Sequence, residues 1–319
     1  MELFIKNSKR TGALPRILFC ESFDQRVLRA AHTLNQHKLA RVVLLGNADL
    51  LDRAACANRT NLTGMDIIDS DTAGFQKEIK AALAHGKKTA DLDPTDPVVA
   101  GSWAAKNGHA DAVIAGAATT SSHVMRIFLR VLGMAKDCQT MSGLSLLAFD
   151  NCPFVRHRVV GLADVSVVPE PTVEQLSDIA IQSAVSYERI IGETARVAFL
   201  SFSTTGSSQH PAALRIATAV TLTRKRKPDL AVDGEMQIDS ALVPAVAGLK
   251  SPSSSVAGNA NVLIFPSLDA GNITVKIFQK FSTYRVLGPV LQGLGHPASY
   301  IPRGSSAEDI VDQVRLLTC

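Results

Sequence analysis

RILFCESFDQRVLRAAHTLNQHKLARVVLLG, residues 16–46, places a helix-length amphipathic segment between two short apolar runs. The same order of an apolar, β-branched run and then a helix-length segment recurs along the chain. Further runs of this kind are DAVIAG (111–116), RVAFLS (196–201), DLAVDG (229–234) and NVLIFP (261–266). Strand followed by helix, repeated, is the pattern of parallel α/β sheets, and nearly all-apolar strands indicate helices on both faces. The sequence therefore predicts an α/β fold.

One segment interrupts this alternation. GLSLLAFDNCPFVRHRVVGLADVSVVPEPT (143–172) predicts two or three extended pieces with no helix between them, and so an antiparallel edge. We therefore expect a second α/β domain to begin near residue 138. Because no low-complexity linker is present, we expect that domain to be inserted into the first. Residues 1–137 and 288–319 would form one domain and residues 138–287 the other.

The composition describes a globular protein. Of the 319 residues, 46% are hydrophobic and 19% are charged. Apolar runs fall well short of the roughly 20 residues that a membrane-spanning helix needs, and the N-terminus carries acid and base where a signal peptide would be apolar. We expect a cytoplasmic protein with no membrane partner. The net charge of +4 suits an anionic small substrate and is too weak to indicate nucleic acid.

Metal, disulfide and nucleotide motifs are missing from the sequence. The five cysteines are scattered without CxxC spacing, and none of the eight histidines forms H-x-x-x-H. There is no G-x-x-x-x-G-K-[ST], no G-x-G-x-x-G after a strand and no G-x-S-x-G. We therefore expect no metal site and no bound cofactor.

Four strand ends lead into small, polar, glycine-containing loops. They are AGAATTSSHVMR (115–126), LSFSTTGSSQHP (200–211), FPSLDAGNIT (265–274) and PRGSSAED (302–309). Ligands of parallel sheets bind outside the carboxyl ends of the strands, and free backbone N–H groups at a helix start bind phosphate or carboxylate. Any one loop is more typical of an ordinary helix cap, but four together favour an anionic ligand. The expected contact residues are Thr119, Thr120, Ser203, Thr204, Gly206, Ser207, Gly271, Asn272, Gly304 and Ser305.

Three charged residues near these loops are candidates for chemistry. Arg126 lies in a helix among apolar neighbours, where an arginine is either a structural ion pair or an anion clamp. Asp309 follows Arg303 by six residues, and its carboxylate could act as a general base or complement the helix dipole. His123 and His210 also lie in polar loops and could contact a ligand, although capping or surface roles fit them better.

The densest basic run is TRKRKPDL, residues 223–230. Cations complement the negative end of a helix, so the run predicts a solvated helix C-terminus. A patch for an acidic partner or for the phosphates of a large cofactor is the alternative.

Long blocks of the chain, in order, resemble the phosphate acetyltransferase family. The blocks are PTVEQLSDIAIQSA (171–184), ARVAFLSFSTTGSS (195–208), KPDLAVDGEMQIDSALVP (227–244), SSVAGNANVLIFPSLDAGNITVKI (254–277) and LGPVLQGLGHPASYIPRG (287–304). The resemblance implies a two-domain, three-layer α/β/α sandwich like that of isocitrate and isopropylmalate dehydrogenases, usually a homodimer. It implies an enzyme that moves an acetyl group between phosphate and coenzyme A. Coenzyme A and acetyl phosphate would bind as substrates in the cleft between the domains.

The resemblance also assigns residue roles. By position, Arg303 matches the family's phosphate-contacting arginine, Asp309 its proposed catalytic base, and Arg126 a second anion-binding arginine. Two positions depart from the family. The serine before the phosphate-contacting arginine is Pro302, which has neither a hydroxyl nor an N–H. The segment EIKAALAHGKKTADLDPTDP (78–97) carries only lysines where the family has a further arginine.

Three other functions remain open. One is a catalytically weakened paralogue that binds coenzyme A or acyl phosphate in a regulatory role. Another is a phosphate acyltransferase for a longer acyl chain such as butyryl. The third is a decarboxylating 2-hydroxyacid dehydrogenase, which would need a cluster of aspartates for a divalent metal, and the sequence offers no such cluster.

Overall fold

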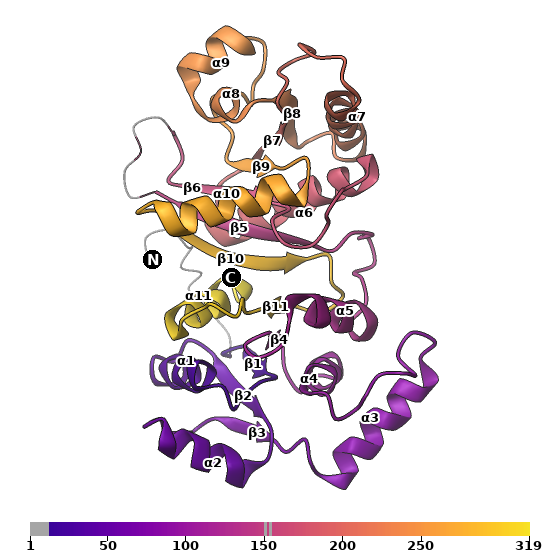
Figure 1. Cartoon of the computed structure of the whole chain (residues 1–319), viewed down its shortest axis with the longest axis vertical. Coiled ribbons are helices and arrows are strands. Elements are labelled where there is room, and N and C mark those ends of the chain that lie inside the picture. The colour runs from indigo at the N-terminus through magenta and orange to yellow at the C-terminus, as the bar shows by residue number, and fades with distance from the viewer. Residues whose placement is uncertain (1–12, 150–151, 153–154) are drawn as a thin grey trace. The chain divides into compact units, whose positions relative to one another are not determined.

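The computed structural model describes residues 13–149, 152 and 155–319. The chain groups into two compact units (Figure 1). The terminal unit combines the described part of Ser8–Lys136 with Leu294–Thr318, and the middle unit is the described part of Asp137–Gly293. Each unit has its own β-sheet with helices packed on it, which confirms the predicted α/β fold class. The division into folding domains at residues 137 and 288 stays a prediction.

The sheet of the terminal unit is parallel, with the strand order β11-β4-β1-β2-β3. The strands are β1 (Arg16–Phe19), β2 (Arg41–Leu45), β3 (Asp66–Ile68), β4 (Ala112–Ala115) and β11 (Ala298–Tyr300). β11 comes from the far end of the chain and places Ser299 opposite Ile114 of β4. Because all these strands are parallel, the loops that follow β4 and β11 lie at the same edge of the sheet.

Helices alternate with these strands, as the opening stretch of sequence predicts. They are α1 (Gln25–Gln36), α2 (Ala48–Ala57), α3 (Ala73–His85), α4 (Pro97–Lys106), α5 (Ser121–Val131) and α11 (Ala307–Leu317). Asp24, Asn47, Thr72, Asp96, Thr120 and Ser306 cap their N-termini with side-chain oxygens.

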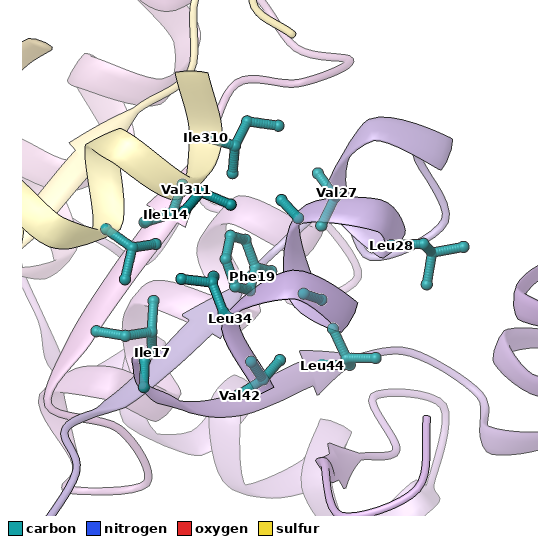
Figure 2. Close-up of a cluster of buried hydrophobic side chains, with 14 of the residues drawn as sticks. Ile17, Phe19, Val27, Leu28, Leu34, Val42, Leu44, Ile114, Ile310 and Val311 are labelled. Atoms are coloured by element: carbon teal, nitrogen blue, oxygen red, sulfur yellow. The ribbon is translucent and has the colours of Figure 1, made fainter. Parts of the chain in front are cut away.

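The core of the terminal unit joins the two ends of the chain (Figure 2). Ile17 and Phe19 of β1 face the same side of the sheet because strand side chains alternate. Helices α1 and α11 cover this side with Val27, Leu28, Leu34, Ile310 and Val311. Fully burying one such side chain stabilises the fold by about 1.5–3 kcal/mol. Packing of α11 on α1 therefore fixes the loop that precedes α11 beside the N-terminal strands.

The middle unit has a mixed sheet with the order β10-β5-β6-β9-β7-β8. Its strands are β5 (Ser142–Ala148), β6 (Val159–Ala163), β7 (Arg196–Leu200), β8 (Ala231–Met236), β9 (Val262–Ile264) and β10 (Arg285–Gln292). β5 pairs antiparallel with both β6 and β10, and the remaining pairs are parallel. The extended segment that interrupts the sequence pattern therefore forms the antiparallel part of this sheet.

The helices of the middle unit are α6 (Val173–Ile191), α7 (Pro211–Arg226), α8 (Ile238–Leu242), α9 (Pro244–Lys250) and α10 (Leu268–Phe281). Thr172 and Gln175 form a capping box at the start of α6, and Gly192 ends it in a left-handed conformation with φ 82°. One core cluster packs α8 and α10 on the sheet through residues such as Ala241 and Val275.

The basic run at residues 223–230 lies at the C-terminal end of α7, and its residues 224–229 are exposed. Arg226, the last residue of α7, forms an ion pair with the buried Asp178 of α6 at 2.5 Å. Arg224 pairs with Asp233 at 2.6 Å. The helix end is therefore solvated, as the sequence predicts, and both arginines also tie α7 to its neighbours within the unit.

The helices within the described residues include none that is both long enough and apolar enough to span a membrane.

Candidate anion-binding site

Two of the four predicted loops meet at the carboxyl edge of the terminal sheet. The N–H of Ile301, just after β11, donates to the carbonyl of Ala115, the last residue of β4, at 2.7 Å. The next residue in the β4 loop is Gly116, with φ +106°. A Cβ on Gly116 would lie only 2.8 Å from the Ile301 carbonyl oxygen, so only glycine fits between the loops. This close approach brings residues 117–120 beside residues 302–306.

Arg26 holds these two loops together. Its Nη1 donates to the carbonyl oxygens of Arg303 at 2.6 Å and Ser305 at 3.1 Å, and its Nη2 donates to that of Ala117 at 2.7 Å. Asp24, the cap of α1, holds the guanidinium from the other side with contacts of 3.0 and 2.8 Å. The ion pair with Arg26 lowers the pKa of Asp24. The backbone on both sides of Gly304 is therefore fixed by a charged group.

The β4 loop does not offer the free N–H groups that the sequence predicts. The buried carboxylate of Glu21 accepts hydrogen bonds from the N–H groups of Gly116 and Ala117 at 2.5 Å and of Ala118 at 3.1 Å. A carboxylate of the protein thus takes the place that an external anion would take in such a loop. The prediction of free donors is therefore wrong for these three residues.

Arg303 lies in a tight turn of the β11–α11 loop. The N–H of Ser305 donates to the Pro302 carbonyl at 2.9 Å, so Arg303 and Gly304 occupy the middle of the turn, where both are exposed. Within the part of the chain that the structure describes, the guanidinium of Arg303 has no hydrogen-bond or ion-pair partner. The turn therefore presents an available cation whose backbone Arg26 fixes.

Asp309 is exposed and belongs to a capping box. Its Oδ2 accepts from the N–H of Ser306 at 2.8 Å, and the Ser306 hydroxyl accepts from the N–H of Asp309 at 3.1 Å. The sequence suggests helix-end stabilisation and general-base catalysis for Asp309, and the first of these two roles is seen directly. The Ser299 hydroxyl is buried and accepts from Gln313, and the Ser306 hydroxyl accepts from Asp309 in the capping box.

Arg126 lies on α5, and a histidine holds it in place. Its Nη2 lies 3.0 Å from Nδ1 of His123, and Nε2 of His123 lies 2.6 Å from Oδ2 of Asp96. Asp96 also caps α4 through the N–H of Val98 at 2.8 Å. The guanidinium of Arg126 is exposed, while the side chains of His123 and Asp96 are 28% and 21% exposed. Thr120 caps α5, and Thr119 lies half-buried just before it.

The lysines in the segment before α4 lie near the same helix. Lys87 and Lys88, just after α3, line a cavity of about 430 Å³ together with Lys106 and Arg130. Arg130 is one helical turn beyond Arg126 on α5 and donates to the Lys88 carbonyl at 2.6 Å. The lysines that replace a family arginine are therefore part of a cationic surface next to α5.

In the middle unit, four predicted contact residues form one network around the buried Glu235. Its Oε1 accepts from the hydroxyl of Ser203 at 2.9 Å and from the N–H of Gly206 at 2.8 Å. The Ser207 hydroxyl lies 3.0 Å from that of Ser203 and accepts from the N–H of Thr204 at 3.1 Å. The structure brings these residues together, but it also pairs the Gly206 donor with a carboxylate of the protein.

Gly271 and Asn272 pack against the loop after β6. A Cβ on Gly271 would lie 2.2 Å from the carbonyl oxygen of Asp164, and Nδ2 of Asn272 donates to the Val165 carbonyl at 3.2 Å. Asp164 itself accepts from the backbone N–H of Gly143 at 2.9 Å, and its burial raises the pKa of the carboxyl group. Helix α10 therefore begins in close contact with backbone.

The sequence does not reveal four residues that hold the polar loops in place. Glu21, Arg26, Asp96 and Glu235 each bind backbone or side chains far away in the sequence, which no local pattern reveals. One local signal was present, because Asp24 two residues before Arg26 at a helix start is a capping pattern with a charged partner. The role of His210 as a cap of α7 agrees with the structural alternative for that histidine.

The fold and these loops define a class of protein. It is an α/β protein with an exposed cationic turn and a second, tethered arginine at the carboxyl edge of a parallel sheet, where proteins of this architecture bind ligands.

The chain belongs to the phosphate acetyl/butaryl transferase family, whose model matches residues 2–318. It is 34% identical over 308 residues to a phosphate acetyltransferase of Clostridium acetobutylicum, covering 94% of this chain and 92% of the relative. It is 36% identical over 313 residues to that of Acetivibrio thermocellus, covering 96% and 92%. These matches confirm the resemblance seen in the sequence.

Solved structures agree with this assignment. A phosphotransacetylase from Streptococcus pyogenes superposes with a TM-score of 0.87 at 32% identity, covering 96% of this chain and 93% of that one. The EutD phosphotransacetylase from Staphylococcus aureus gives a TM-score of 0.85 at 29% identity, with 97% and 94% covered. A branched-chain phosphotransacylase from Enterococcus faecalis, at 14% identity and a TM-score of 0.69, shares the fold.

Proposed function

We propose that this protein transfers an acetyl group between phosphate and coenzyme A, converting acetyl phosphate and coenzyme A into acetyl-coenzyme A and phosphate and back. The observation that carries this proposal is the exposed guanidinium of Arg303, which has no partner among the described residues and lies in a turn that Arg26 fixes. Relatives at 34–36% identity over nearly the full chain are phosphate acetyltransferases. Coenzyme A acts here as a substrate, and no resident cofactor is needed.

The phosphate group needs cationic partners throughout the reaction. It is part of the acetyl phosphate substrate and is also the leaving group, so its negative charge must be stabilised at every stage. Arg303 binds it with two parallel N–H donors, and Arg126 provides a second charge. The coenzyme A thiol, with an unperturbed pKa near 8.5, becomes a better nucleophile when a carboxylate accepts its proton. Asp309 takes this role through the oxygen that does not cap α11. The thiolate sulfur then attacks the acetyl carbon, and phosphate leaves with the electron pair of the broken C–O bond.

Pro302 is the reason to expect slow transfer. It cannot donate a hydrogen bond to the carbonyl oxygen as that oxygen becomes negative. Loss of one such donor costs about 10²–10³ in kcat. The hydroxyls of Ser305 and Ser306 can compensate in part, because the Ser306 oxygen is an acceptor in the capping box and keeps its own proton to donate. Pro302→Ser should raise kcat by up to about 10²-fold with the KM for coenzyme A roughly constant.

Residues of both units contact the substrates in this proposal. The contacts from the terminal unit are Thr119, Thr120, Gly304 and Ser305. The contacts from the middle unit are Ser203, Thr204, Gly206, Ser207, Gly271 and Asn272. Gly206→Val should raise the KM for coenzyme A, because φ +78° is strained for a β-branched residue and the added side chain would take up space beside the loop where coenzyme A is proposed to bind.

We also propose a cytoplasmic homodimer. The five cysteines are free thiols, as expected in a reducing compartment. Helix α10 exposes Ile273, Ile277 and Phe281 at 58%, 52% and 86%, and their spacing of four residues places them on one face. A second copy of the chain would cover this face. Phe281→Glu should shift the mass measured by light scattering to that of a monomer, whereas Leu50→Glu on α2 should leave it unchanged.

The decisive test of the phosphate site is the KM for phosphate in Arg303→Ala. We expect it to rise by at least 10-fold, because a charge-assisted bidentate contact is hard to replace. Arg29→Ala, an exposed arginine of α1, is the matched control and should behave like wild type. Assays with acetyl, propionyl and butyryl phosphate establish the acyl chain. If no acyl phosphate reacts while coenzyme A still binds in calorimetry, a regulatory binding protein is the correct reading.

A further inference from the structure

The strongest unassigned feature of the terminal unit is the chain of contacts from Asp96 through His123 to Arg126. Nε2 of His123 lies 2.6 Å from Oδ2 of Asp96, and Nδ1 lies 3.0 Å from Nη2 of Arg126. Both contacts are short enough for full hydrogen bonds. Asp96 and His123 are well covered by their neighbours, while the guanidinium at the end of the chain is exposed. A partly buried pair thus ends in an exposed cation.

The donors and acceptors in this chain have one consistent assignment. The guanidinium of Arg126 is always protonated and can only donate, so Nδ1 of His123 must accept. The proton of the neutral ring therefore lies on Nε2, which donates to the carboxylate of Asp96. Each partner fixes the other, because the carboxylate selects the tautomer that presents a lone pair to Arg126.

The pair is anchored to the framework of the unit. Oδ1 of Asp96 accepts from the N–H of Val98 at 2.8 Å and of Val99 at 3.4 Å, which ties the carboxylate to the first turn of α4. His123 is in the first turn of α5 and Arg126 in the next. The direction of the Arg126 guanidinium is therefore set by the position of α4 relative to α5.

We infer that Asp96 and His123 are positioning residues that hold the guanidinium of Arg126 in the orientation that binds the phosphate of the acyl phosphate. This inference rests on the proposed function. Without the pair, a flexible exposed arginine would lose rotamer freedom each time an anion bound. With the pair in place, the Arg126 side chain is already ordered in the folded protein, so anion binding costs less conformational entropy.

Three substitutions separate this role from a structural one. His123→Asn keeps an acceptor near the position of Nδ1 but loses the donor to Asp96. His123→Gln keeps a donor near the position of Nε2 but loses the acceptor for Arg126. Asp96→Asn keeps the cap of α4, but its amide turns a donor toward His123, so the ring must take the other tautomer and present N–H to Arg126.

The experiment measures the KM for phosphate, the KM for coenzyme A and the urea unfolding of all three variants. We expect the phosphate KM to rise about 5- to 20-fold in His123→Gln and Asp96→Asn, as for the loss of one hydrogen bond to a charged group, and less than 3-fold in His123→Asn. The KM for coenzyme A should stay within about 2-fold. His32→Gln on α1 is the control for a histidine substitution outside the site.

If the pair had only a structural role, phosphate affinity would follow stability. His123→Gln retains the contact with Asp96 and should unfold at a urea concentration at least as high as that of His123→Asn. Under the inference, His123→Gln nevertheless binds phosphate more weakly than His123→Asn. The inference is overturned if phosphate affinity follows stability, or if His123→Gln matches wild type. If the wild type forms no thioester, the proposed function fails, and calorimetric titration with acetyl phosphate in the same three variants still decides the positioning role.

Discussion

Replacing Arg26 by lysine tests how the phosphate-binding turn is held. The arginine donates to three backbone carbonyls, those of Ala117, Arg303 and Ser305, and pairs with Asp24 through two nitrogens. A lysine carries its three donors on a single nitrogen and cannot reach the carbonyls of both loops at once. The carbonyls of the exposed turn can recover water, whereas Ala117 is buried, so its carbonyl recovers little.

The expected loss in the free energy of unfolding follows from these contacts. A hydrogen bond to a charged group contributes about 1.5–3 kcal/mol, and the side chain of Arg26 is 25% exposed, which favours the lower value. With one contact fully lost and two partly replaced by water, Arg26→Lys should lower the free energy of unfolding by about 2–3 kcal/mol. The KM for phosphate should rise at least 5-fold, because Arg303 no longer has a fixed backbone.

The assay combines urea denaturation with steady-state kinetics, and Arg29→Lys on the exposed face of the same helix is the control. A variant that loses stability but binds phosphate normally would show that Arg26 has a structural role alone. A variant with unchanged stability and unchanged phosphate KM would refute the reasoning altogether.

Three further predictions concern the framework around the site. Gly116→Ala should destabilise the fold by at least about 2 kcal/mol in urea denaturation, because its Cβ would lie 2.8 Å from a backbone carbonyl at φ +106°. Arg226→Ala should cost about 2–3 kcal/mol, less than the 3–5 kcal/mol typical of a fully buried pair, because Arg226 is 36% exposed while Asp178 is 5% exposed. Arg26 lowers the pKa of Asp24, so that carboxylate stabilises the fold above its unfolded pKa of about 4 and this contribution is lost as pH falls through the lower folded value. The difference in unfolding free energy between wild type and Asp24→Asn should accordingly shrink below about pH 4, and a constant difference would contradict it.

The strands that carry long apolar runs could be predicted from the sequence. RVVLLG became β2 and RVAFLS became β7, each within a residue or two of the run. β11 could not be predicted, because ASY is three residues long and becomes a strand only through its pairing with β4. Its position matters for function, since it places the Arg303 turn beside the β4 loop.

Only part of the candidate site could likewise be predicted from the sequence. The polar loops and the exposed arginines follow from residue types at the ends of strands. The hydrogen bonds of their N–H groups do not follow from the sequence, because Glu21, just after β1, and Glu235 of β8 satisfy donors that look free in it. Long-range pairing of a carboxylate with a loop leaves no local pattern, so such residues become visible only when the strands are placed.

The most direct test of the proposed function is thioester formation from acetyl phosphate and coenzyme A, followed by absorbance of the thioester in wild type, Arg303→Ala and Arg29→Ala. We predict coenzyme A-dependent formation of acetyl-coenzyme A by wild type and by Arg29→Ala, with Arg303→Ala requiring far more phosphate in the reverse direction. If wild type forms no thioester at concentrations where calorimetry shows coenzyme A bound, the protein is not an acetyltransferase and the roles proposed for Arg303 and Asp309 are wrong.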